Sequence, residues 1–152
     1  MRKLWIAAVL ALALAVVGMA AASIAKEDYS YNAKLTAKQE VPAPKGVPAK
    51  AGGNFKATVT ENGSKRSIKW TLTFHNLSGK AVAAHIHMGK PGVAGGVILA
   101  LCGPCKTGAH GSTPTTTAIG DALEEGKAYV NVHTAKNAGG EIRGAVKLVG
   151  HS

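Results

Sequence analysis

The chain has 152 residues and a formal net charge of +10 at pH 7, from 18 basic and eight acidic side chains. This length suits one domain with a core of its own, and the two cysteines are too few and too close together to form a disulfide framework. The basic residues are mostly scattered lysines that do not alternate with aromatic residues, which argues against nucleic-acid binding.

Residues 1–25 have the three parts of a secretory signal peptide. Two basic residues open the segment, an apolar run follows, and small residues lead to cleavage points after Ala22 and Ala25. We expect export of residues 26–152 as a single domain to the periplasm, the cell surface or the extracellular medium. If the segment is retained, its apolar stretch is long enough to anchor the protein in a membrane.

Beyond residue 25 the chain shows strand patterns separated by Gly, Pro and Asn, and almost no helix pattern. Alternation predicts seven strands, at residues 29–35, 54–60, 67–75, 81–88, 96–101, 128–134 and 141–149. Asn62-Gly63 is a hairpin signal. We predict a loop over 39–53, a long connection over 106–120 and at most one helical turn over 121–125. The spacing predicts an all-β fold, an antiparallel sandwich or barrel of about seven or eight strands.

Alternation in the strand 81–88 places two histidines on one face. The core face is expected to carry the apolar positions Val82, Ala84, Ile86 and Met88. His85 and His87 then share the opposite face.

The same rule applied to strands 128–134 and 141–149 gives more polar side chains opposite the core. These residues are Tyr129, Asn131, His133, Glu141 and Arg143. If the three strands are neighbours in the sheet, these side chains and the two histidines form one polar patch.

One hairpin pattern occurs twice, in residues 85–98 and 131–142. Each copy has a polar residue, a β-branched residue and a histidine, followed by a loop containing lysine, a Gly-Gly pair and a new strand. His87 aligns with His133. Two such hairpins related by an approximate two-fold axis would bring these histidines to face each other.

Three motifs resemble the CHRD domain, which is named for its occurrence in chordin. They are the segment Ala33–Pro42, the segment Ala84–His87 with the following Gly89, and the pair of segments Tyr129–Thr134 and Gly140–Gly144. The resemblance spans almost all of the chain after residue 31. It implies an immunoglobulin-like β-sandwich or barrel in an exported protein. In chordin the surrounding protein binds growth factors, so an extracellular protein partner is one expectation, and the activity of stand-alone members stays open.

Two histidines at positions i and i+2 of a strand, with a third from a neighbouring strand, form a common ligand set for a transition metal. We predict His85, His87 and His133 as ligands, with Glu141 as the fourth ligand or a supporting residue. Nearby sulfur in Met88, Cys102 and Cys105 would favour copper over zinc.

The same patch has two other interpretations. In the first, it is a metal-free hydrogen-bonded network, with Arg143 paired to Glu141 and the histidines bonded to the same carboxylate, inside an adhesion or protein-interaction domain. In the second and weaker one, it is a redox site like that of superoxide dismutases, whose strands carry His-x-His. The patch lacks the further His and Asp ligands of a bridged two-metal site, and no Ser-His-Asp arrangement is indicated.

The string Cys102-Gly-Pro-Cys105-Lys106 matches the active-site string of thioredoxins. The Thr- and Gly-rich residues that follow cannot form the helix whose N-terminus lowers the thiol pKa in that family. We expect a local disulfide in an exported protein. A thiolate metal site that includes His110 and an oxidoreductase are the alternatives, in that order.

Overall fold

The computed structural model describes residues 25–152, so the predicted signal segment lies outside the described residues except for its last position. The elements, in chain order, are β1 (Lys26–Thr36), η1 (Ala37–Gln39), β2 (Gly52–Asn62), β3 (Lys65–His75), β4 (Ala81–Met88), β5 (Val97–Cys102), β6 (Ala109–Pro114), α1 (Thr117–Glu124), β7 (Ala128–Thr134), β8 (Ile142–Ala145) and β9 (Lys147–His151). None of the described helices has the length and apolar character to cross a membrane.

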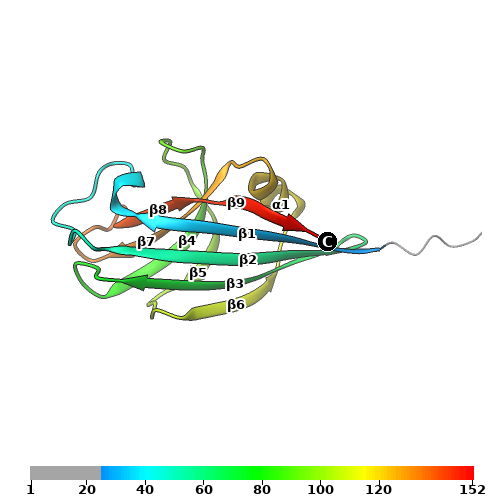
Figure 1. Ribbon diagram of the computed structural model, residues 1–152, viewed down its shortest axis with the longest axis horizontal. Coiled ribbons are helices and arrows are strands. Elements are labelled where there is room, and N and C mark those ends of the chain that lie inside the picture. The colour runs from blue at the N-terminus through cyan, green and yellow to red at the C-terminus, as the bar shows by residue number, and fades with distance from the viewer. Residues whose placement is uncertain (1–24) are drawn as a thin grey trace, which may run out of the picture.

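The strands pair antiparallel in the order β5-β4-β7-β8-β1-β2-β3-β6, and β9 pairs with β1. The two strands at the ends of this path, β5 and β6, contact each other, so the sheet curls into a nearly closed barrel (Figure 1). The predicted all-β antiparallel fold is confirmed, and of its two forms the barrel is the one adopted.

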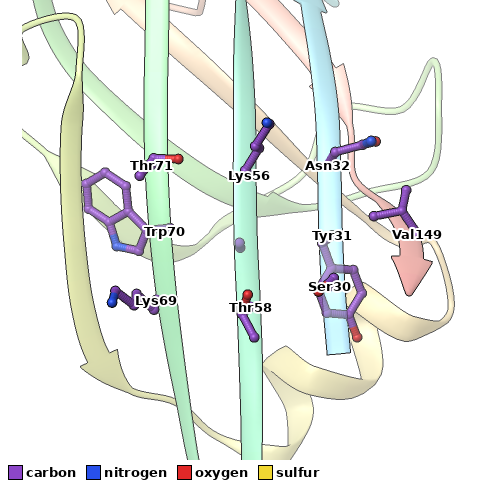
Figure 2. Close-up of a pocket in the computed structure, with 10 residues that line it drawn as sticks. Ser30, Tyr31, Asn32, Lys56, Thr58, Lys69, Trp70, Thr71 and Val149 are labelled. Carbon is purple, nitrogen blue, oxygen red and sulfur yellow. The ribbon is translucent and has the colours of Figure 1, made fainter. Parts of the chain in front are cut away.

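Strands β1, β2 and β3 follow the predicted alternation over residues 29–35, 54–60 and 67–75. The predicted hairpin is present: Asn62 pairs with Lys65, so Gly63 and Ser64 form the two-residue turn, with Gly63 in the left-handed region at φ 61°. Fully buried core residues of these strands include Leu35, Phe55, Val59, Ile68 and Leu72. Figure 2 shows polar residues on the outer face of the same strands, where Asn32, Lys56 and Thr71 lie in one register row.

A bulge in β4 changes its predicted core face. The register against β7 shifts between Ala81 and Ala83, so Ala81 points into the core and Val82 does not. Val82 is 44% exposed and Met88, the last residue of the strand, is 39% exposed. The prediction of a core position was therefore right for Ala84 and Ile86 and wrong for Val82 and Met88.

Three expectations about the second half of the chain need correction. The connection predicted over 106–120 contains β6, which pairs with β3, and the start of α1. The predicted single turn is an eight-residue helix, whose first turn is capped by the side chain of Thr116 accepting from Ile119 N. The strand predicted over 141–149 breaks at Val146, because β8 pairs with β7 and β1 whereas β9 pairs with β1 alone.

Candidate metal centre

Strands β4, β7 and β8 are neighbours in the sheet, as the polar patch requires. His85 pairs in register with Asn131, which pairs with Arg143, and His87 pairs with Tyr129. The order β5-β4-β7-β8 also sets the two similar hairpins symmetrically about the β4–β7 pair. The predicted neighbourhood of the three strands is present, and it places His85, His87, Tyr129, Asn131 and Arg143 at paired positions, whereas Glu141 precedes β8 and lies outside this register.

His85, His87 and His133 form a cluster in which one ring nitrogen of each lies within 4.8 Å of one from each of the others. The ring centroids are 4.9 Å apart for His85 and His133, 5.6 Å for His85 and His87, and 5.9 Å for His87 and His133. Among residues 25–152 this is the one group of three or more His, Cys, Asp or Glu side chains with such spacing. The structure thus brings together the three histidines singled out from the sequence.

Backbone carbonyls hold two of the three rings in place. Nδ1 of His87 donates to the carbonyl of Gly95 at 2.9 Å, and Nδ1 of His133 donates to the carbonyl of Ala138 at 2.9 Å. Each carbonyl belongs to the loop that follows the histidine's own strand. Because Nδ1 carries the proton, the neutral form of each ring has its lone pair on Nε2.

The third ring is joined to the second by a direct hydrogen bond. Nδ1 of His85 lies 3.1 Å from Nε2 of His133. Since Nε2 of neutral His133 is an acceptor, His85 is the donor in this pair and its Nδ1 carries the proton. Nε2 of His87, by contrast, is buried and has no hydrogen-bond partner among the described residues.

The surroundings keep two of the rings neutral. Burial lowers the pKa of His85, and the neighbouring rings of His133 and His87 lower it further. Burial also lowers the pKa of His133, against a smaller raising effect of its bond to Ala138. Neutral imidazole is the form that binds a metal ion, because a protonated ring has no free lone pair.

Tyr129 and Arg143 support the loop over residues 89–96. The Tyr129 ring stacks on His87, with centroids 4.9 Å apart, and the Arg143 guanidinium lies 3.4 Å from the Tyr129 centroid. Nη2 of Arg143 donates to the carbonyls of Lys90 and Val93, and the Tyr129 hydroxyl contacts both backbone groups of Gly95. These residues position the carbonyl that orients His87.

Glu141 is directed away from the histidines. Its carboxylate accepts from Ser78 N, from Ser78 Oγ and Thr134 Oγ1 at 2.5 Å each, and from Asn137 Nδ2 at 3.1 Å. Burial raises the pKa of Glu141, but these hydrogen bonds outweigh it and hold that pKa below its usual range. The described residues show neither a Glu141–Arg143 pair nor a Glu141–histidine bond, which the network hypothesis had expected.

The candidate sulfur ligands also lie apart from the cluster. Cys102 and Cys105 are joined to each other in a disulfide, so neither offers a thiolate. Met88 is a neighbour of His87 on β4, and strand alternation turns its side chain to the other face. The group of possible ligands therefore consists of imidazoles alone.

Glu40 is a site residue that the strand patterns did not predict, because it lies in the proline-containing loop after η1. It is 5% exposed, its Oε1 accepts from Val41 N at 3.1 Å, and burial raises its pKa. It shares the interior with Asn131 and Arg143, each of which has a buried polar atom without a partner among the described residues. The sequence signal that could have identified Glu40 was its position within Ala33–Pro42, one of the segments that resemble the CHRD domain.

The fold and the cluster together define a small antiparallel β-barrel domain with three histidines gathered on one sheet face. The model of the CHRD domain family matches residues 31–146, and the chain belongs to this family. Neither the curated proteins nor the solved structures contain a match to the chain.

Proposed function

We propose that this protein is an exported CHRD-domain module that binds one transition-metal ion through His85, His87 and His133, for sequestration or delivery. The observation that carries the proposal is the state of His87 Nε2, which is buried and has no partner. A buried polar atom left without a partner costs about 1–3 kcal/mol, and a ligated ion would remove that cost.

The hydrogen bonds around the rings are those that metal ligands need. Ligating histidines typically donate their other ring nitrogen to a carbonyl or carboxylate, which fixes the ring and its tautomer. His87 and His133 do this through Gly95 and Ala138. The proton between His85 and His133 is the one that binding would displace, since both facing nitrogens are candidate ligand atoms.

We propose copper as the metal because the candidate ligands are imidazoles, and not because of nearby sulfur. The expected sulfur ligands are absent from the cluster, so the preference rests on the imidazoles. For a site of nitrogen ligands the affinity of divalent ions rises to a maximum at Cu²⁺ and falls at Zn²⁺. Three protein ligands leave a further coordination position for water or for a group of a delivery partner.

Access and export fit such a role. His85 is partly exposed, so the cluster reaches the surface, whereas His87 and His133 are each 8% exposed. The export of the domain rests on the signal pattern of residues 1–25. Partners other than the ion would be extracellular proteins, and a membrane would be involved if the signal segment were retained.

The test is a titration of the tag-free domain, residues 26–152, with Cu²⁺, Cu⁺ and Zn²⁺ by calorimetry and competition with chelators. We expect one ion per chain with sub-micromolar affinity for Cu²⁺ and weaker binding of Zn²⁺. The variant His85→Ala/His87→Ala should lose this binding. The matched control is His75→Ala/His110→Ala, which removes two exposed histidines elsewhere and should leave it unchanged.

Two outcomes contradict the proposal. Equal binding by both variants would place the metal elsewhere, and no sub-micromolar binding by the parent protein would favour the metal-free interaction domain. Circular dichroism of each variant shows whether the fold survives, and His85→Gln, at the partly exposed position, tests the site if the double variant unfolds. Superoxide dismutation by the metal-loaded protein would support the redox alternative.

A further inference from the structure

A second candidate site lies at the end of the barrel where β3 ends and β6 begins, between residues 74–81 and 104–107. These segments line a cavity of about 530 Å³. Its wall is formed mainly by apolar groups, namely Phe74, Leu77, Ala81, Pro104 and Cys105. Lys80, Lys106 and His75 also line it, and all three are exposed. Pockets of this volume with apolar walls and a few polar groups are typical sites for small molecules.

The two sides of the cavity are tied together by hydrogen bonds. Phe74 N donates to Thr107 Oγ1 at 2.8 Å, and Cys105 N donates to the carbonyl of Ala81 at 3.0 Å. The disulfide between Cys102 and Cys105 closes the loop that carries Pro104. The cavity is therefore held open by contacts between its own walls and needs no ligand to shape it.

The charged residues that line the cavity, Lys80 and Lys106, are both basic. No carboxylate lines it. The exposed or partly exposed acids gather at the opposite end of the barrel, at the start of β1, the end of β2 and around α1 (Figure 1). Glu141, which accepts hydrogen bonds from Ser78, is fully buried and bonded to four donors, so it offers no free charge to the cavity. The two lysines that line the cavity thus have no carboxylate among the other lining residues to compete for a bound anion.

We infer that this cavity binds a small amphipathic anion, a molecule with an apolar body and one carboxylate. The apolar wall would take the body, and the ammonium groups of Lys80 and Lys106 would bind the carboxylate. A neutral apolar molecule would leave the lysines unused, and a multiply charged one would place charge against the apolar wall, which is costly. This site is separate from the histidine cluster and does not depend on the proposed metal.

The probe is decanoate, with decanol as its uncharged counterpart, titrated into the tag-free domain at neutral pH and low salt. We expect one decanoate per chain, binding about three- to tenfold more tightly than decanol, and weakening as salt is added. Amide shifts in two-dimensional NMR spectra should be confined to residues 74–81 and 104–107.

Three variants make the test specific. Lys80→Gln/Lys106→Gln should reduce the decanoate affinity to that of decanol and leave decanol unchanged. Lys56→Gln/Lys69→Gln removes two lysines from the outer sheet face and should change neither. Gly79→Phe should weaken both ligands, because Gly79 lines the cavity, has no atom within 4 Å of an added Cβ and carries no charge. Equal loss in both lysine variants, shifts outside the cavity, or decanol binding as tightly as decanoate would overturn the inference.

Discussion

Replacing Glu141 with glutamine should lower the free energy of unfolding by about 3 kcal/mol, although the two side chains have nearly the same shape. The carboxylate accepts four hydrogen bonds and no part of it is exposed. Those bonds join the turn that follows β7, at Thr134 and Asn137, to the loop at Ser78, which is 63 residues from Glu141 in sequence.

The magnitude follows from the number of donors. A hydrogen bond to a charged group contributes about 1.5–3 kcal/mol and a neutral one about 0.5–1.5 kcal/mol. Each of the three hydrogen bonds that glutamine can still accept is therefore weaker by about 1 kcal/mol. If the new amide NH₂ takes the place of the oxygen facing Ser78 N, that buried N–H also loses its acceptor, at about 1–3 kcal/mol. The smaller cost of burying a neutral amide offsets part of this sum.

The effect should depend on pH in a defined direction. Because the folded-state pKa of Glu141 lies below the ordinary value of 4.5, its ionised form adds stability above that value. The contribution disappears as the pH falls through the folded pKa, where the protonated acid resembles glutamine. The difference between the parent protein and Glu141→Gln should therefore be full at pH 6 to 7 and shrink below pH 4.5.

Urea unfolding at several pH values measures this difference, provided that the m-value is unchanged. Glu124→Gln is the control, because Glu124 is exposed at the end of α1, and its effect should stay within about 0.5 kcal/mol. A loss below 1 kcal/mol for Glu141→Gln at pH 7, or a difference that does not change down to pH 3, would refute the reasoning.

Three further results are expected. Cys102→Ser/Cys105→Ser, which opens a loop of only four residues, should cost about 2 kcal/mol in urea unfolding; an effect above 4 would contradict the chain-entropy estimate. Gly95→Ala should weaken metal binding by about 10–100-fold, because an added Cβ would overlap the Met88 carbonyl and displace the loop that orients His87; unchanged affinity would exclude that role. Proton competition at the two histidines with lowered pKa should begin only below pH 6.5, so a fall in metal affinity between pH 8 and 7 would contradict their assignment.

The parts of the fold that follow from local pattern were predictable. Strands β1 to β3 are long and alternate over most of their length, and a turn with a left-handed glycine joins two of them. The break at Val146 was not predictable from alternation, because it depends on Val146 N reaching the carbonyl of Ala128. β6 has little strand propensity of its own and forms because β3 offers it an unpaired edge.

The candidate site was predictable to the level of faces but not of contacts. Alternation placed His85, His87 and His133 opposite the core, and the repeated hairpin brought them together. What alternation cannot show is that loops cover that face, which leaves Arg143 1% exposed. For the same reason the pairing of Arg143 with Glu141 was expected and not found, since the guanidinium instead binds loop carbonyls.

The metal-binding and network hypotheses draw on the same residues, and this explains why the sequence alone could not separate them. Glu141 holds Asn137, the turn that contains Asn137 presents the carbonyl of Ala138, and that carbonyl fixes His133. Such a chain of hydrogen bonds orders the barrel whether or not an ion is present, and it also reduces the cost of gathering the ligands. The difference lies at His87 Nε2, where a closed network would provide a partner and the described residues provide none. Asn131 Oδ1 and Arg143 Nη1 are also buried without a partner among residues 25–152, but His87 Nε2 is the unsatisfied atom that belongs to the group of three imidazoles, so we describe the network as a support for a ligand.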